Sequence, residues 1–321
     1  MSGVGFRCDA GVRSGVGHLV RCVALAEELC ARGVPVVFLG EVRGSDWARA
    51  QLSERGLPLV PAPGRPARLA GLVRELRLDA VVLDSYELPD GTGAALRGAG
   101  PRVLAIVDGD PLGQEADLYL DQNLGAERRP FPRPAPRLAG ARYVLLRDSV
   151  RRRRRARRAG PVPRVLCFFG GTDSAGVASA WAGALRATGA AFEATVVSPE
   201  PFEADGPITV IPPTDRLPDL MAEADLVVTA AGSAIWELLY LGVPTALSWV
   251  ADNQLIGYEE LVGRGVAAGL GREADARAVG VLARLLADPA AREEHGWRGS
   301  GLVDGLGRER VADALLRPDP S

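Results

Sequence analysis

The chain has 321 residues, of which 47% are hydrophobic, and its formal net charge is −2. This length is about twice that of a usual domain, so two domains are expected, and the near-neutral charge excludes a general basic field for nucleic acid. All 38 basic residues are arginines, which excludes a Schiff-base lysine and the lysine of a phosphate-binding loop.

The cysteines and the hydropathy pattern indicate the cellular compartment. Cys8, Cys22, Cys30 and Cys167 show no C-x-x-C spacing, so we expect reduced core residues. No apolar run reaches the ~18 residues that span a bilayer, and the first ten residues lack the basic start and apolar stretch of a signal peptide. The sequence therefore predicts a cytoplasmic protein without a transmembrane segment.

Short apolar runs alternate with amphipathic segments along the first half of the chain. Gly3–Cys8 predicts a strand, and apolar residues at three- and four-residue spacing predict a helix from about His18 to Arg32. Ser45 is expected to cap a helix over about Asp46–Arg55. Further strands are expected at Val36–Leu39, Ala80–Leu83, Arg102–Val107 and Leu118–Leu120.

The second half repeats this pattern and ends in an amphipathic helix from about Leu306 to Leu316. Strands alternating with helices predict parallel sheets covered on both faces. We therefore predict an α/β protein with two Rossmann-like domains facing across a cleft, residues 1–150 and 164–321, joined by a linker over residues 151–163. The strands expected in the second domain are Arg164–Phe169, Ala191–Val197, Ile208–Ile211, Asp225–Thr229 and Val243–Trp249.

The linker contains seven arginines in the eight positions Arg151–Arg158, followed by Pro161 and Pro163. A solvated linker or helix end is one interpretation, and a site for phosphate or an acidic partner is the other. One basic cluster in an acidic protein does not make a nucleic-acid binder, so we expect no nucleic-acid partner.

A glycine-rich turn, Gly15-Val16-Gly17-His18, follows the first strand and opens a helix. Glycines allow the backbone to approach a ligand, and a helix N-terminus offers free N–H groups to an anion. Val20 stands where a dinucleotide fingerprint needs glycine. The histidine has a side chain suited to proton transfer at neutral pH; the alternative is a cap or a satisfied core residue.

The opening Gly15–Arg21, followed by Ala24-Leu25-Ala26, resembles that of the pseudaminic acid pathway hydrolases. Those enzymes cleave UDP from a UDP-linked diacetamido trideoxyhexose, and their group includes spore-coat polysaccharide "predicted glycosyltransferases". The lipid II-forming N-acetylglucosaminyltransferase is more distantly similar. The resemblance covers about residues 4–316 and implies a glycosyltransferase-B fold, no cofactor, and a substrate site that includes Gly15, Gly17, His18 and Arg21.

Polar residues follow the strands of the first half, at the ends where open α/β sheets bind ligands. Asp84 and Tyr86 follow Ala80–Leu83. The family pattern there is Asp-His-Tyr, so Ser85 departs from it and puts the role of a second histidine in doubt. The resemblance implies that Asp84 lies at the substrate and that Tyr86 hydrogen-bonds the sugar; packing is the alternative for Tyr86.

The next strand is followed by an Asp-Gly-Asp turn at Asp108–Asp110. Taken alone, D-x-D suggests a metal-diphosphate site, but the resemblance implies a metal-independent enzyme in which Asp108 orients His18 or a water. A helix-capping turn is the alternative. Asp121–Asn123 resembles the family's following polar turn, and Asn123 is expected to reach the cleft.

Three turns of the second half complete the predicted site. Gly232-Ser233 starts a helix whose N-terminus is expected to meet the diphosphate. In similar enzymes a glutamate at the position of Glu237 binds the ribose, although Glu237 could lie on the surface. Asn253 and Gln254 are expected to hold sugar hydroxyls, unless Asp252 is a plain helix cap. The remaining turn resembles the family's nucleotide-side loop, and the alternative is a purely structural turn. Its residues are Gly170, Gly171, Thr172 and Asp173.

These features predict an inverting nucleotide-sugar hydrolase. His18 would deprotonate water, helix N-termini would stabilise the leaving diphosphate, and UDP or another nucleoside diphosphate would be released from an amino or deoxy sugar. An inverting glycosyltransferase would use the same groups with a glycan, lipid or natural-product acceptor. A non-catalytic sugar-nucleotide binder and an arginine-dependent nucleic-acid or membrane binder are further alternatives. The oligomeric state is open, with a monomer favoured.

Overall fold

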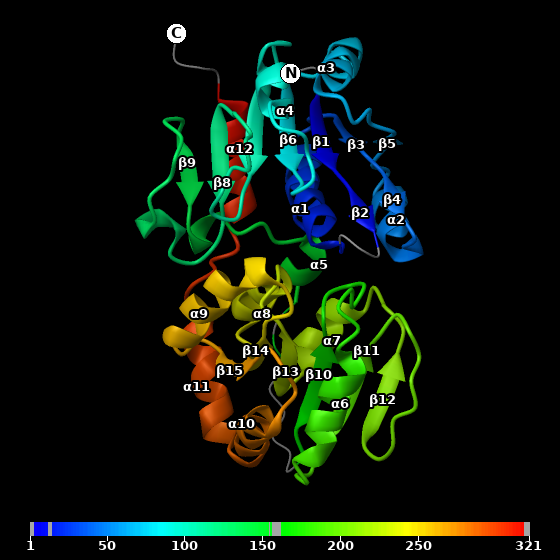
Figure 1. Ribbon diagram of the computed structural model, residues 1–321, viewed down its shortest axis with the longest axis vertical. Helices are drawn as coiled ribbons and strands as arrows, with labels where there is room; N and C mark the ends of the chain where they lie inside the picture. Colours follow the sequence, from blue (N-terminus) through cyan, green and yellow to red (C-terminus); the bar gives the residue numbers. More distant parts are fainter. Residues whose placement is uncertain (1–2, 12–14, 154, 156–161, 318–321) are drawn as a thin grey trace. The chain divides into compact units, whose positions relative to one another are not determined.

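The computed structural model describes residues 3–11, 15–153, 155 and 162–317, which form two compact units (Figure 1). The first unit runs to Asp148 and is completed by the chain from Gly305 onward. The second unit comprises Ser149–Asp304 together with Gly15–Gly17. Each unit contains one main parallel sheet with helical connections. The predicted α/β class with two Rossmann-like domains is confirmed.

The main sheet of the first unit has seven strands in the order β5-β3-β1-β6-β7-β8-β9, and every pairing is parallel. Val4 is paired with both Val36 and Ala80, which fixes the register at the centre. A separate pair joins β2 (Ala10–Gly11) to β4 (Val42–Arg43). The main strands are β1 (Val4–Cys8), β3 (Val36–Leu39), β5 (Leu59–Val60), β6 (Ala80–Asp84), β7 (Arg102–Ile106), β8 (Leu118–Asp121) and β9 (Arg137–Ala139).

The burial of the strands and their parallel direction explain where the polar residues gather. All five residues of β1 and of β6 are buried, as expected for parallel strands covered on both faces. Because the strands are parallel, their carboxyl ends meet at one edge of the sheet. Asp84 and Asp121 end their strands, and Asp108 follows β7 by two residues. The polar residues therefore gather at this edge.

The helices of the first unit follow the predicted periodicity. In α1 (Gly17–Ala31) residues Leu19, Val23, Ala26 and others are buried. Ser45 caps α2 (Asp46–Ser53), its Oγ accepting from the Ala48 N–H at 3.2 Å. The remaining helices are α3 (Pro66–Glu75), α4 (Thr92–Arg97), η1 (Ala126–Arg128), η2 (Ala141–Tyr143) and α12 (Gly307–Leu316).

The last helix, α12, belongs to the first unit, whereas the sequence assigned residues 164–321 to the second domain. Its buried Arg308 pairs with Asp148 at 2.7 Å and with Glu27 and Glu28 at 3.3 Å each. Gly307 packs so closely that an added Cβ would lie 2.2 Å from the Val144 carbonyl oxygen. An amphipathic pattern requires a partner surface without specifying which one. The sequence therefore did not reveal that the last helix packs on the first unit.

The sheet of the second unit has the order β12-β11-β10-β13-β14-β15, again with parallel pairing throughout. Trp181 and Phe169 stack in its core at 5.9 Å between ring centroids. The strands are β10 (Arg164–Phe168), β11 (Glu193–Val197), β12 (Ile208–Ile211), β13 (Leu226–Ala230), β14 (Thr245–Ser248) and β15 (Ala268–Gly271). The helices are α6 (Ala178–Ala187), α7 (Leu217–Glu223), α8 (Ala234–Leu241), η3 (Asp252–Gln254), α9 (Leu255–Gly263), α10 (Ala276–Ala287) and α11 (Pro289–Ser300).

The arginine-rich segment begins in α5 (Asp148–Arg151), and two of its described arginines form ion pairs inside the second unit. Arg153 binds the Asp219 carboxylate, and Arg155 pairs with Glu293 at 2.7 Å. Arg154 and residues 156–161 of the predicted linker lie outside the described residues.

Two predictions from composition can be compared with the described residues. Cys8, Cys22 and Cys167 are buried free thiols as expected. Cys30, which lies in the last turn of α1, is exposed. No helix in the described part of the chain combines the length and the apolar character needed to cross a membrane.

Candidate active site

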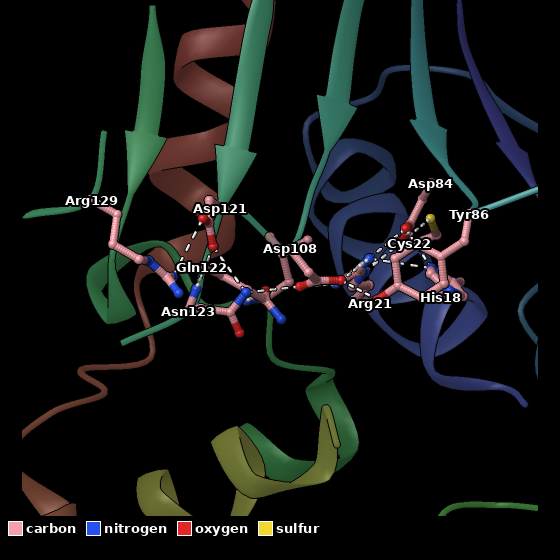
Figure 2. A network of polar contacts seen from close by, with 11 residues as sticks. His18, Arg21, Cys22, Asp84, Tyr86, Asp108, Asp121, Gln122, Asn123 and Arg129 are labelled. Atoms are coloured by element: carbon pink, nitrogen blue, oxygen red, sulfur yellow. Dashed lines mark hydrogen bonds and ion pairs between the residues drawn. The ribbon is translucent and has the colours of Figure 1, made fainter. Parts of the chain in front are cut away.

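A continuous polar network runs along the carboxyl edge of the first unit's sheet (Figure 2). α1 provides His18 and Arg21, and the ends of β6 and β8 provide Asp84 and Asp121. The segments after β6, β7 and β8 add Tyr86, Asp108 and Asn123. The structure thus brings together all the first-domain side chains that the sequence predicted for the site, although their contacts could not be predicted.

His18 and Asp84 form a hydrogen-bonded dyad, with His18 Nδ1 2.6 Å from Asp84 Oδ1. Asp84 is fully buried, which by itself would raise its pKa, but the neighbouring Arg21 and His18 hold that pKa below its usual range. An ionised carboxylate only accepts hydrogen bonds, so the proton of a neutral His18 ring lies on Nδ1. His18 Nε2 is then free to accept a proton.

Arg21 bridges the two carboxylates of the network. Its Nε and Nη2 donate to Asp84 at 2.7 and 2.6 Å, and its Nη1 lies 3.2 Å from both oxygens of Asp108. Burial would lower the pKa of Arg21, but Asp108 and Asp84 together hold it well above its usual range. The resemblance implied a substrate contact for Arg21; the observed contacts are with the protein's own carboxylates.

Asp108 is the second centre of the network. It accepts hydrogen bonds from the Tyr86 hydroxyl and, at 2.8 Å, from Asn123 Nδ2. Its pKa lies well below the usual range because Arg21, Tyr86 and Asn123 stabilise the charge more than burial disfavours it. Tyr86 is 46% exposed, and its ring meets the His18 ring edge-on with 4.6 Å between the ring centroids. Burial of its hydroxyl and the charge of Asp108 raise the pKa of Tyr86, so Tyr86 remains a donor at neutral pH.

The two carboxylates of the Asp-Gly-Asp turn make different contacts. Asp108 faces Arg21, whereas Asp110 Oδ1 accepts from the Leu112 N–H at 2.7 Å and so caps the turn. Among the residues that the structure describes, no three His, Cys, Asp or Glu side chains are grouped so that they could hold a metal ion.

The sequence pointed to the Asp121–Asn123 turn but not to a role for Asp121 itself. Asp121 is completely buried, and its Oδ1 accepts from Asn123 Nδ2 at 2.9 Å. Burial raises the pKa of Asp121, and Arg129 lies 3.6 Å from its Oδ2. The sequence signal for this residue was a polar side chain at the end of an otherwise buried apolar strand.

The glycine-rich turns lie where the sequence predicted them. Gly15 precedes α1 with a φ of 75°, and Gly17 is the first residue of that helix. In the second unit Gly170 and Gly171 follow β10, and Gly170 also has a φ of 75°. This conformation strains residues other than glycine, so backbone geometry accounts for the glycines at these two positions.

Asp173 caps α6 from the end of the same loop. Its carboxylate accepts from the N–H groups of Val177 and Ala178 at 3.1 and 3.0 Å. Burial raises the pKa of Asp173, although the two N–H groups oppose this effect. Thr172 beside it is also buried. The Asp173 carboxylate therefore binds the backbone N–H groups at the start of α6.

The second glycine turn leads into α8. Ser233 is the N-cap residue of α8, but its side chain makes no capping hydrogen bond. Glu237 is only 4% exposed, which excludes the alternative of a surface residue. Gln254 lies beside this turn, because a Cβ at Gly232 would be 3.9 Å from Gln254 Nε2, while Asn253 is exposed.

Comparison with known proteins identifies the family. No protein-family model matches the chain. The uncharacterized protein MJ1062 of Methanocaldococcus jannaschii is 21% identical over 78% of the chain and 56% of that relative's own length. The UDP-N-acetylglucosamine–N-acetylmuramyl-(pentapeptide) pyrophosphoryl-undecaprenol N-acetylglucosamine transferase of Xanthomonas oryzae is 30% identical over 94% of the chain and 77% of its own. The chain belongs to this transferase family.

The solved structures support the same fold. Acinetobacter baumannii MurG matches with a TM-score of 0.68 and 16% identity, covering 98% of this chain and 99% of MurG. The spinosyn rhamnosyltransferase SpnG in complex with thymidine diphosphate matches with a TM-score of 0.64 and 15% identity, covering 97% of this chain and 100% of its own. These MurG-type and related structures confirm the glycosyltransferase-B fold.

The MurG-type relationship corrects the predicted reaction. The sequence favoured hydrolysis of a nucleotide sugar, but the Xanthomonas oryzae relative and the structural neighbour SpnG are both named as transferases. The prediction of a hydrolase is therefore wrong. The physical reason for the error is that a histidine base can deprotonate water or an acceptor hydroxyl equally well, so the residues at the base do not distinguish the two reactions.

Proposed function

We propose that the chain is an inverting glycosyltransferase that moves a sugar from a uridine diphosphate donor to a hydroxyl group of an acceptor. Membership of the MurG-type family supports transfer. The observation that carries the assignment of the base is the His18–Asp84 hydrogen bond of 2.6 Å, which leaves His18 Nε2 free to take a proton. UDP is favoured because the characterised relative uses UDP-N-acetylglucosamine.

In this reaction His18 Nε2 takes the proton of the acceptor hydroxyl as its oxygen attacks the anomeric carbon. The bond from that carbon to the diphosphate oxygen breaks, and its electron pair leaves with UDP. The imidazolium that forms is stabilised by the Asp84 carboxylate, as in other carboxylate–histidine pairs. Arg21 keeps Asp84 ionised and fixed, and in this way supports the base.

The second unit is the proposed donor site. We assign the diphosphate to the backbone N–H groups of two segments, Gly170–Asp173 and Gly232–Ser233, because exposed N–H groups at turns and helix starts attract anions. Glu237, buried in the first turn of α8, is proposed to accept hydrogen bonds from the ribose hydroxyls. Asn253 and Gln254 are proposed to hold hydroxyls of the transferred sugar.

The test is a donor panel with and without acceptors. The protein is incubated with UDP-N-acetylglucosamine, other UDP-sugars and dTDP-sugars, and UDP or dTDP release is measured alone and after adding glycan, lipid or small-molecule hydroxyl acceptors. We expect acceptor-dependent release and a glycoside of inverted anomeric configuration. Rapid release that is independent of every acceptor, or a product of retained configuration, would contradict the proposal. Release of dTDP alone would retain the transferase and change its nucleotide.

A further inference from the structure

The side-chain amide of Asn123 is held between two carboxylates. Its Nδ2 donates to Asp108 Oδ1 at 2.8 Å and to Asp121 Oδ1 at 2.9 Å. An amide nitrogen carries two hydrogens, so these two contacts use both. Asn123 Oδ1 accepts no hydrogen bond from the part of the chain that the structure describes, and it points away from the network in Figure 2.

The two carboxylates determine which way the amide faces. In the reverse orientation Asn123 Oδ1 would lie against two carboxylate oxygens, with no hydrogen between acceptor atoms. Asp108 is ionised, because Arg21, Tyr86 and Asn123 hold its pKa well below the usual range. The reverse orientation would therefore remove one donor from an ionised carboxylate and place an acceptor against it, which is costly in a half-buried position.

Asp121 holds the amide whether or not it is ionised. Its Oδ1 accepts both the backbone N–H of Asn123, at 3.1 Å, and the side-chain Nδ2. Its Oδ2 is buried without a hydrogen-bond partner among the described residues, and Arg129 Nη2 lies 3.6 Å from it. A proton taken up by Asp121 would bind at the unoccupied Oδ2, so Oδ1 remains the acceptor that orients the amide.

We propose that Asp121 is a positioning residue that, together with Asp108, fixes the Asn123 amide so that its oxygen accepts a hydrogen bond from a substrate hydroxyl. This inference rests on the proposed transferase function. An amide oxygen can only accept, so its partner must be a donor, and a sugar or acceptor alcohol presents hydroxyls. The carboxylates behind it disfavour a phosphate or carboxylate at the same position.

Two substitutions at Asp121 separate orientation from charge. Asp121→Asn can place its amide oxygen where Oδ1 lies and so keep the Asn123 orientation. Asp121→Leu has a similar size but offers no acceptor, so the Asn123 amide keeps only its hydrogen bond to Asp108. We expect Asp121→Leu to raise KM about tenfold, the effect of one hydrogen bond, with a smaller change in kcat, and Asp121→Asn to stay near the parent value.

The kinetic readout identifies the source of the hydroxyl. KM is measured separately for the sugar nucleotide and for the acceptor that the donor panel identifies. A rise confined to the donor assigns the hydroxyl to the transferred sugar, and a rise confined to the acceptor assigns it to the acceptor molecule. Equal values for Asp121→Leu and Asp121→Asn, whether both normal or both impaired, would overturn the proposal.

A stability measurement tests, without any substrate, whether the Asn123 side chain lies against the two carboxylates. Asn123→Asp places a third carboxylate against Asp108 and Asp121, so its folded-state pKa is raised above the unfolded value of about 4. The loss in Tm relative to the parent protein should therefore be small near pH 4 and grow as the pH rises to 7, whereas the control Asn123→Ala should show a loss that changes little with pH. A pH-independent loss for Asn123→Asp would refute the contacts with the two carboxylates from which the amide orientation is inferred. This outcome is separate from a failure to find transferase activity.

Discussion

The assignment of His18 as the base depends on Asp84, and Asp84→Asn tests it directly. The carboxylate serves four donors: Oδ1 accepts from His18 Nδ1 and Arg21 Nη2, both at 2.6 Å, and Oδ2 accepts from Arg21 Nε at 2.7 Å and from Cys22 Sγ at 3.5 Å. An asparagine at position 84 has one acceptor oxygen, which can take the place of either Oδ1 or Oδ2 of the aspartate. One of its two orientations directs the new NH2 group at Arg21 Nε, and the other directs it at both His18 Nδ1 and Arg21 Nη2.

Each orientation has a defined cost. An NH2 group facing His18 forces the ring proton onto Nε2, so the ring can no longer accept a proton from the substrate. Both orientations set the NH2 group against an Arg21 donor in a buried place, and disruption of a buried ion pair costs about 3 kcal/mol. Both also remove the carboxylate charge that stabilises the imidazolium, and replacing the carboxylate of such a pair by an amide lowers kcat by about 10⁴-fold.

The assay is kcat/KM for the sugar nucleotide and acceptor identified by the panel, with Tm measured on the same samples. The matched control is Asp46→Asn, which removes the same charge from a fully exposed carboxylate at the start of α2 in the same unit. We expect the control to retain parent activity. A folded Asp84→Asn protein with nearly parental turnover would refute the reasoning, because His18 would then not need Asp84 to set its tautomer.

Three further predictions follow from the same contacts. His18→Gln should abolish turnover while UDP binding, measured by calorimetry, is unchanged; a parallel loss of UDP affinity would instead assign His18 to binding. Glu237→Gln should weaken UDP binding about tenfold through its ribose contacts, and an unchanged dissociation constant would remove Glu237 from the donor site. The depressed pKa values of Asp84 and Asp108 give a stability contribution that is present above the unfolded value of about 4 and is lost as the pH falls below it. Asp108→Asn should therefore lower Tm at pH 7 by more than at pH 3, and an equal loss at both would contradict the ion pair with Arg21.

Much of the fold could be predicted because buried parallel strands are short apolar runs. Val36–Leu39 and Ile208–Ile211 were predicted with the observed bounds. The strands that were missed are short or contain little apolar sequence. β5 has two residues, and β15 reads Ala-Gly-Leu-Gly, so neither has a pattern that distinguishes a strand from a loop.

Candidate site residues could be predicted for a related reason. A polar residue directly after an apolar strand lies at the ligand-binding edge of an α/β sheet, and this rule, together with the family resemblance, indicated Asp84, Asp108 and Asn123. It could not reveal that Arg21 joins two of them, because a buried arginine in a helix has no distinctive spacing. It also gave no role to Asp121, whose importance lies in the single amide that it holds.

The sequence by itself determined the two α/β halves, the edge at which polar groups gather and the presence of a histidine able to move a proton. Only the tertiary structure decided the partners of these groups. His18 and Asp84 are 66 residues apart, and Arg21 and Asp108 are 87 residues apart. A hydrogen bond depends on distance and angle to within a few tenths of an ångström, and residue order along the chain does not contain that information until the strands are aligned side by side.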